Sequence, residues 1–263
     1  MSEKSDIEWT DATWNPVTGC SKVSPGCAHC YAERLSLRFG RSQLPWTPAN
    51  AEQNVVLHPE RLGVPIAWRQ PRKVFVNSMS DMWHPMVPDD FIDQVFQVMQ
   101  VTDRHTYQIL TKRPELMRRW FAGYGAQWAA APLPNVWLGT SIENDRWVGR
   151  ADELRGTPAS VRFISAEPLL GPLPSLDLTG IDWLIVGGES GSSHRPMDES
   201  WVLALRDMAD GAGTAFFFKQ WGGRTPKAGG RHLEGRTWDA YPDPANGGSV
   251  RVPASEAEVQ GHG

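Results

Sequence analysis

The stretch KVFVNSMSDMWHPMVPDDFIDQVFQVMQVTDRHTYQILT, residues 73–111, holds a strand pattern, a helix pattern and a second strand pattern in succession. Residues 73–78 and 106–111 are β-branched and apolar enough for buried strands. Residues 89–100 have a helical period, with Asp89 as the expected N-cap and one apolar face made of Phe91, Ile92, Val95, Phe96 and Met99. Two strands joined in this way predict a parallel pair with a right-handed crossover.

The same alternation continues on both sides of this stretch. Further strands are expected near 13–19 and at 135–141, 161–166, 182–188 and 215–220. Helices are expected at 31–40, at 114–121 with proline in the first turn, near 145–155, and at 198–210, the last ended by Gly211 and Gly213, whereas 41–72 looks irregular. Strands that recur about every 25–35 residues with helices between them predict an α/β fold, a full or partial parallel (β/α)6-7 TIM-like barrel.

Polar residues follow the apolar part of each expected strand. They are Asn77, Ser78, Ser80, Asp81, Thr111, Lys112, Arg113, Thr140, Ser141, Glu143, Asn144, Ser165, Glu167, Gly187, Gly188, Glu189, Lys219 and Gln220. In β/α barrels the loops at the carboxyl ends of the strands build the active site. Any one of these residues can equally serve as a cap or turn residue, but together they predict a polar site at this end of the barrel.

All three cysteines of the chain fall in GCSKVSPGCAHCYAE, residues 19–33, at Cys20, Cys27 and Cys30. An odd number of cysteines in a reducing compartment argues against disulfides. One alternative is zinc, held by three thiolates and a histidine such as His29, His58 or His84. The other is an iron–sulfur cluster with three cysteine ligands, which leaves one iron open. A structural zinc site usually has four protein ligands in two knuckles, and this chain has one knuckle, so the ligand count favours the cluster.

Composition sets further limits. The chain has 263 residues, of which 40% are hydrophobic and 21% are charged, as in ordinary globular proteins. Its longest apolar runs are too short to cross a bilayer, and its polar N-terminus lacks the apolar stretch of a signal peptide, so we expect a cytoplasmic protein without membrane contact. The net charge of −4 gives no support to a nucleic-acid partner, although a local basic groove is compatible with it. The thirteen tryptophans are expected mainly in the core and in pocket walls.

Three segments are expected. Residues 1–222 form the barrel domain with the cysteine loop. Residues 223–242 form an irregular C-terminal extension that packs on the barrel, because Trp238 and Tyr241 are unfavourable to expose. Residues 243–263 have the composition of a disordered tail.

A three-cysteine loop after the first strand of a β/α barrel resembles the radical S-adenosylmethionine superfamily. The sequence most resembles a phage- and prophage-associated three-cysteine-motif family without an assigned role, over about residues 7–242. The motifs that carry this resemblance are IEWTDATWNPVTGC, GCSKVSPGCAHCYAE, FVNSMSDMWH, QILTKRP, VWLGTSIEN, FISAEPLLGP, WLIVGGESG, FFFKQWGG and GRTWDAYP.

The resemblance implies a mechanism. Cys20, Cys27 and Cys30 would bind three irons of a [4Fe–4S] cluster, and the fourth iron would bind S-adenosylmethionine. One-electron reduction would then release methionine and a 5′-deoxyadenosyl radical, which abstracts hydrogen from a substrate. The implied partners are S-adenosylmethionine, an electron donor such as a flavodoxin or ferredoxin, and a protein encoded by a neighbouring gene. The substrate would be a nucleotide or nucleic acid of phage origin.

The sequence departs from the superfamily at two places. The cysteine spacing is C-x6-C-x2-C instead of the commoner C-x3-C-x2-C, and His29 stands where an aromatic residue is common. The Gly-Gly-Glu motif that ends the second strand in the superfamily is replaced by SMSD, and the chain's own GGE, residues 187–189, ends a later strand. The cofactor-binding candidates are therefore His29 and Tyr31 beside the cysteines, Ser78, Ser80 and Asp81 for the amino group, and Ser141, Glu143 and Asn144 for the ribose or carboxylate.

Other strand-end residues are candidates for catalysis or substrate binding, namely Lys112, Arg113, Glu167, Gly188, Glu189 and Lys219. The three basic residues could bind an anionic group or pair with Glu167 and Glu189. Two other functions remain open from the sequence. One is a zinc-binding, non-enzymatic phage protein that binds a protein partner. The other is a barrel hydrolase with Glu167 or Glu189 as its general acid or base, which leaves the cysteines unexplained.

Overall fold

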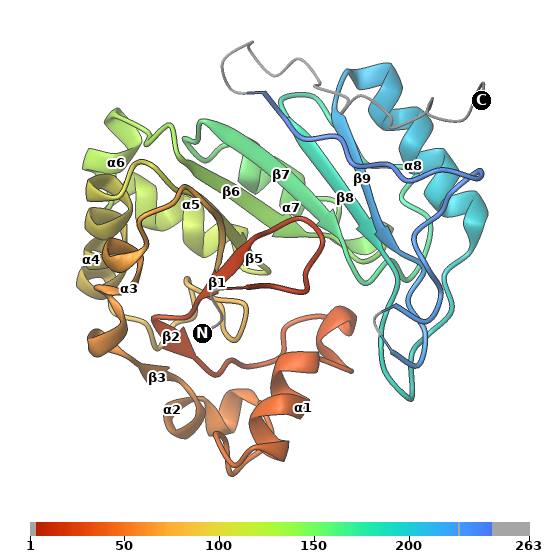
Figure 1. Cartoon of the computed structure of the whole chain (residues 1–263). Coiled ribbons are helices and arrows are strands. Elements are labelled where there is room, and N and C mark those ends of the chain that lie inside the picture. Colours follow the sequence, from red (N-terminus) through yellow and green to blue (C-terminus); the bar gives the residue numbers. More distant parts are fainter. Residues whose placement is uncertain (1–3, 226, 244–263) are drawn as a thin grey trace, which may run out of the picture.

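The computed structural model describes residues 4–225 and 227–243. Its main feature is a seven-stranded sheet with the order β1-β4-β5-β6-β7-β8-β9, in which every neighbouring pair is parallel. The strands are β1 (Ala12–Trp14), β4 (Lys73–Val76), β5 (Thr106–Thr111), β6 (Val136–Ser141), β7 (Val161–Ala166), β8 (Trp183–Gly187) and β9 (Ala215–Gln220). The sheet curves without pairing β1 to β9 (Figure 1). The fold is an α/β partial TIM-like barrel, as the sequence predicts.

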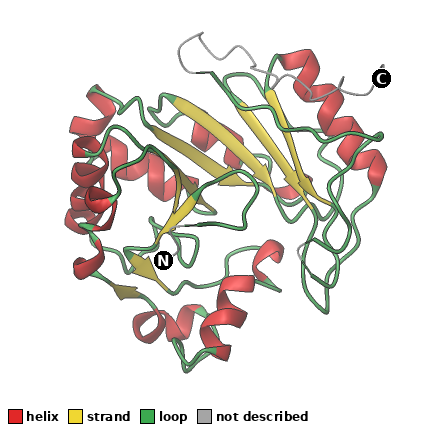
Figure 2. Cartoon of the chain, viewed as in Figure 1, coloured by secondary structure: helices red, strands yellow, loops and turns green. Residues whose placement is uncertain are grey.

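Helices cover the convex face of this sheet (Figure 2). The longer ones are α4 (Asp89–Val101), α5 (Pro114–Ala122), α7 (Arg150–Arg155) and α8 (Glu199–Ala212), and α6 (Ala126–Ala130) follows α5. The five apolar residues expected on one face of α4 are all buried. Figure 1 shows α1 (Tyr31–Arg38) apart from these helices, on the inner side of the curved sheet.

The structure corrects several local predictions. Asp89 is not the N-cap of α4, because Pro88 is the extended residue before the helix and Asp89 opens its first turn. The strand expected near 13–19 is interrupted at Pro16, which has no N–H to donate. Only β1 joins the main sheet, and β2 (Val17–Thr18) pairs with β3 (Val56–Leu57) in a separate antiparallel sheet.

Three more local features differ from expectation. The segment 41–72 is not wholly irregular, because it contains the short helices α2 (Ala51–Asn54) and α3 (Val64–Ala67) besides β3. Gly211 lies inside α8, and Gly213 ends that helix with a left-handed φ of 67°. The helix expected near 145–155 is divided into a 3-10 turn, Asp145–Trp147, and α7.

A cluster of aromatic side chains packs on the concave side of the sheet. Trp183 of β8 is fully buried, and five rings surround it with centroids within 6.2 Å, those of Trp9, Trp137, Phe163, Phe217 and Tyr241. Gly139 of β6 is required in this cluster, since a Cβ there would lie 2.4 Å from the Phe163 ring. Nine of the thirteen tryptophans are buried, in agreement with their expected place in the core.

The C-terminal extension runs along β9. The backbone N–H of Phe218 donates to the carbonyl of Trp238 at 2.9 Å, and that of Ala240 donates to the carbonyl of Phe216 at 3.2 Å. The Trp183 indole Nε1 donates to the Ala240 carbonyl at 2.9 Å. The tail expected from residue 243 onward lies outside the described residues except for Asp243. No helix in the described ranges is long and apolar enough to cross a membrane.

Replacing Trp183 by alanine tests the weight of this aromatic cluster. The variant should lose about 3–5 kcal/mol of unfolding free energy, because a buried indole leaves a cavity among five rings. Urea unfolding measures the loss, with Tyr124→Ala as control, since Tyr124 is 54% exposed. Equal stabilities of the two variants would contradict the assigned role of this cluster.

Candidate functional site

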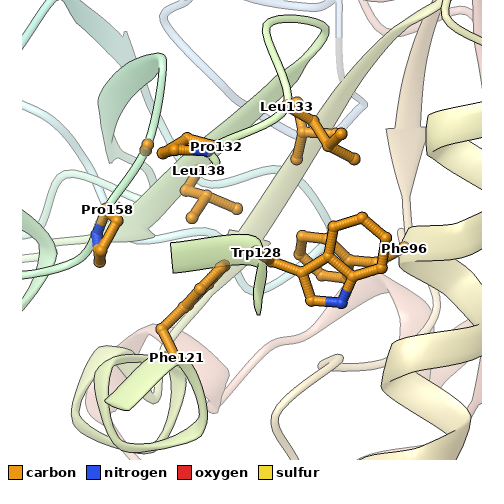
Figure 3. A pocket seen from close by; sticks show the side chains of 9 residues that line it. Phe96, Phe121, Trp128, Pro132, Leu133, Leu138 and Pro158 are labelled. Carbon is orange, nitrogen blue, oxygen red and sulfur yellow. The ribbon is translucent and has the colours of Figure 1, made fainter. Parts of the chain in front are cut away.

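A cavity of about 1050 Å³ opens on the concave side, at the carboxyl ends of the strands. The cysteine loop and α1 form one wall, and residues from the ends of β4 to β9 form the rest. A second hollow lies between the sheet and the outer helices, where Phe96, Phe121 and Trp128 face Leu138 (Figure 3). That hollow holds only about 10 Å³, roughly the space of one water molecule, so the large cavity is the candidate site.

All three cysteines line this cavity and none forms a disulfide. Cys27 ends the 3-10 turn Pro25–Cys27, and Cys30 directly precedes α1. Burial raises the pKa of the Cys20 thiol to about 12 and also raises the pKa of Cys30. Within residues 4–225 and 227–243, no group of three or more His, Cys, Asp or Glu side chains is gathered closely enough to hold a single metal ion.

A buried ion pair connects the cysteine loop to the sheet. Arg113 Nη1 lies 3.0 Å from Asp81 Oδ2, and both side chains are at most 7% exposed. Arg113 Nη2 donates to the carbonyl of Ser21 at 2.8 Å, and Nη1 donates to Cys20 Sγ at 3.5 Å. Asp81 also accepts from the Thr111 hydroxyl at 2.7 Å. Asp81 and Arg113 were both predicted to contact a ligand. In the structure they bond to each other, and Arg113 also bonds to Cys20.

Glu189 connects the loop after β8 to the cysteine loop. Its carboxylate accepts from Nε of Arg195 at 2.9 Å, and His29 Nδ1 lies 3.0 Å from Oε2. Arg195 Nη2 also donates to the carbonyl of Pro25, inside the cysteine loop, at 3.0 Å. Although burial opposes ionisation, these donors lower the pKa of Glu189 to about 2. Glu189 is thus a carboxylate at neutral pH, which does not suit the general acid of the hydrolase hypothesis.

Glu143 and Asn144 do not line the cavity, although both were expected to bind cofactor. Glu143 is fully buried behind the cysteine loop, where it accepts from Ser24 Oγ at 2.5 Å and from Arg150 Nη1 at 3.0 Å. Lys112 Nζ lies 3.8 Å from the same carboxylate. The Asn144 side chain accepts from the backbone N–H of Arg146 and caps a 3-10 turn. In this structure the two residues have structural roles. Glu143 bonds the cysteine loop to Arg150, and Asn144 caps a turn.

The other expected residues line the cavity. The hydroxyls of Ser78 and Ser80 are bonded to Asn15 and to the Val17 carbonyl, and the Tyr31 hydroxyl donates to the Ser78 carbonyl at 2.7 Å.

The last three expected residues lie at the ends of β7, β8 and β9. Lys219 Nζ lies 2.5 Å from Glu167 Oε1, so these two candidates form an ion pair in the cavity wall. Gly188 is needed for packing, because a Cβ there would lie 2.0 Å from the Trp221 carbonyl oxygen.

Four buried polar atoms of residues in the cavity wall have no hydrogen-bond partner within the described part of the chain. They are Trp9 Nε1, Ser141 Oγ, Ser165 Oγ and Gln220 Oε1. Ser141 and Ser165 pair in register on β6 and β7, and each is 1% exposed. A buried hydroxyl without a partner is unfavourable, so these atoms indicate a ligand that bonds to them. Ser141 was among the predicted cofactor-binding residues, whereas Ser165 and Gln220 were noted only as strand ends.

Arg195 was missed altogether. Arg195 lies six residues after Glu189, and this spacing only weakly indicates a functional residue. The sequence does not show that its guanidinium donates a hydrogen bond to Pro25. His58 and His84, two of the three histidines considered for zinc, lie away from the cavity wall and bond through both ring nitrogens. His29 is the histidine of that set that shares the cavity with the thiols.

The sequence matches, over residues 4–242, the family described as Protein of unknown function (DUF5131), and the chain belongs to this family. No curated protein matches the chain. Among solved structures, it is similar to a mutant of spore photoproduct lyase at 10% identity and a TM-score of 0.35. That similarity covers 74% of this chain, which spans 59% of the length of the lyase chain.

The pH dependence of stability tests the contacts of Glu189. Because its pKa is lowered to about 2 in the folded protein, its contribution is complete above the unfolded pKa near 4.5 and is lost as the pH falls toward 2. At neutral pH this contribution is on the order of 3 kcal/mol. Urea unfolding of the metal-free protein between pH 6 and pH 2 should therefore show a flatter profile for Glu189→Gln than for the wild type.

The matched control is Glu115→Gln, since Glu115 is exposed on α5. Its profile should follow the wild type. If Glu189→Gln also follows the wild type, the contacts with Arg195 and His29 do not hold the carboxylate as described.

Proposed function

We propose that this protein is a radical S-adenosylmethionine-type iron–sulfur enzyme that modifies a nucleotide or nucleic-acid substrate of phage origin. One observation carries the proposal. Every thiol of the chain lines one large cavity at the carboxyl ends of a partial β/α barrel. This is the end of such a fold where active sites are built, and three cysteine ligands leave one iron of a [4Fe–4S] cluster open.

The residues present fit such a cluster. Cys20, Cys27 and Cys30 supply three sulfur donors from one wall, and Arg113 donates to Cys20 Sγ, the kind of hydrogen bond that orients and tunes a ligand sulfur. The unpartnered hydroxyls of Ser141 and Ser165 are available to a polar cofactor. The volume of about 1050 Å³ exceeds the 300–1,000 Å³ typical of one ligand, which leaves room for cofactor and substrate together.

With S-adenosylmethionine bound, the cluster would supply a 5′-deoxyadenosyl radical. The chain's own residues would do the rest. The three thiols lose their protons to become ligands, and Arg113 positions Cys20. Glu189, through His29 and Arg195, holds the cysteine loop against the loop after β8. The aromatic cluster around Trp183, of which Trp9 and Phe75 line the cavity, would exclude water from that part of the cavity wall.

The proposal includes partners and a location. S-adenosylmethionine would bind in the cavity, an electron donor such as a flavodoxin or ferredoxin would reduce the cluster, and a protein from a neighbouring gene would assist. The enzyme would work in the cytoplasm, where thiols stay reduced.

Electron paramagnetic resonance tests the cofactor. Anaerobically reconstituted, dithionite-reduced protein should give a [4Fe–4S]⁺ signal that changes when S-adenosylmethionine is added, because the cofactor binds the open iron. Cys30→Ala should lose this signal, whereas Val23→Ala, in the same loop, should keep it. A protein that takes up one zinc and no cluster would contradict the proposal and favour the zinc-binding, non-enzymatic alternative.

The hydroxyls of Ser141 and Ser165 allow a second test. Since neither has a partner, Ser141→Ala and Ser165→Ala should unfold at the wild-type urea concentration or above it. Each should weaken binding of S-adenosylmethionine to reconstituted protein by about three- to tenfold, the effect of one hydrogen bond, as measured by titration calorimetry.

Ser160→Ala provides the opposite pattern, because its hydroxyl bonds to carbonyls away from the cavity, such as that of Val136 at 3.0 Å. That variant should lose stability and keep its affinity. Unchanged affinity in both cavity variants would show that these serines do not bind the cofactor.

A further inference from the structure

The cavity wall has the opposite charge balance to the chain as a whole. The chain has 26 basic and 30 acidic residues, yet eight Lys and Arg side chains line the cavity against five Asp and Glu side chains. Three of the five acids form ion pairs. Asp81 pairs with Arg113 and Glu167 pairs with Lys219 inside the cavity, and Glu189 pairs with Arg195, which does not line it. The other two, Asp6 and Glu8, lie on the N-terminal segment. The surplus of positive charge among the lining residues therefore lies on exposed side chains at the opening of the cavity, which we call the mouth.

Four exposed cations make up this surplus. Arg34 and Arg38 lie one turn apart on α1, and Arg224 and Lys227 lie in the loop after β9. None of the four forms an ion pair with another described residue. Arg34 Nη2 donates to the carbonyl of Ser190 at 3.1 Å, which places α1 against the loop after β8. Cations from two distant segments thus flank one opening.

Exposed apolar side chains gather beside these cations. The described chain exposes ten large hydrophobic residues, and five of them fall within residues 23–39, namely Val23, Tyr31, Leu35, Leu37 and Phe39. Phe39 is 61% exposed, and the guanidinium groups of Arg38 and Arg41 lie 5.7 and 5.8 Å from its ring centroid. Phe39 follows the end of α1, outside the residues that line the cavity, and both guanidinium groups lie over its ring. A base that stacks on Phe39 takes the place of one guanidinium group beside the positive charge of the other.

We propose that this mouth, formed by α1 and the loop after β9, binds single-stranded nucleic acid. Arg34, Arg38, Arg224 and Lys227 contact the phosphates, and a base stacks on Phe39. Binding of the strand does not rest on the proposed function. Only the statement that the bound strand is the substrate of the cavity rests on it. The cations and the ring are part of the protein surface whether or not a cluster is bound.

Single strands suit this surface better than duplexes or acidic peptides. A ring can stack on a base only where the base is unpaired, and a reaction inside the cavity likewise requires a base outside a duplex. An acidic peptide would satisfy the cations but has no flat ring system in each residue to stack on Phe39. Cations from two segments at one opening also suit a polyanion that carries a charge on every residue.

The test is fluorescence anisotropy of a fluorescein-labelled 15-nucleotide single-stranded DNA titrated with the full chain at several NaCl concentrations. The double variant Arg38→Glu/Arg224→Glu should bind at least about tenfold more weakly than the wild type at 50 mM NaCl. Its plot of log affinity against log salt should be shallower by about 1.4, for two lost phosphate contacts at about 0.7 each. Phe39→Ala should weaken binding at least about fivefold with the salt slope unchanged.

The control is Arg69→Glu/Arg119→Glu, which changes the net charge equally at two exposed positions outside the cavity. It should bind as the wild type does. Equal losses in both double variants, stronger binding of a duplex of the same sequence, or displacement of the strand by polyglutamate at equal charge would each overturn the proposal. Strand binding without a cluster signal would refute the radical function and leave this surface assigned. A cluster signal without strand binding would refute the nucleic-acid substrate alone.

Discussion

The buried pair between Arg113 and Asp81 is the interaction on which the rest of the site depends. Removing two charges from water is unfavourable unless each is compensated by hydrogen bonds, and here both charges are hydrogen-bonded to each other and to neighbouring groups. Asp81 accepts from the end of β5, and Arg113 extends to Ser21 and Cys20 in the cysteine loop. A long irregular loop without disulfides thereby gains a fixed position on the sheet. Without this pair, Cys20 would lose its link to the ends of β4 and β5, and only the contacts of Glu143 and Glu189 would hold the later part of the loop.

The polar groups of the cavity and of the buried region behind the cysteine loop fall into two sets with different uses. Asp81, Glu143, Glu189 and their basic partners bond to one another and hold loops together. Ser141, Ser165 and Gln220 keep unpartnered atoms in the wall, and the mouth keeps its cations. The first set stabilises the loops, and the second set has polar atoms and charges available to bind a ligand. The distinction follows from hydrogen-bond partners and is independent of residue type.

The order of strands and helices and the polar end of the barrel follow from apolar periodicity, so the sequence predicts them. The apolar face of α4 is an example, since its spacing alone identifies the residues that become buried. Partners across the fold are a different matter. Ser78, Ser80 and Asp81 have the chemistry of ligand-binding residues, but their bonds go to Asn15, Val17 and Arg113. The net charge of −4 likewise does not reveal the excess of basic over acidic side chains in the cavity lining, because a sum over the whole chain contains no information on position.

The contact between the C-terminal extension and β9 has a consequence for how copies of this chain meet. An incomplete barrel has two open edges, and unpaired N–H and C=O groups on an edge strand are a template for another chain. The backbone bonds from Trp238 and Ala240 to Phe218 and Phe216 occupy that template on β9. The strand they cover is AFFFKQ, whose run of three phenylalanines has the composition of an amyloid-forming segment. The extension therefore protects against aggregation, a role independent of any reaction in the cavity.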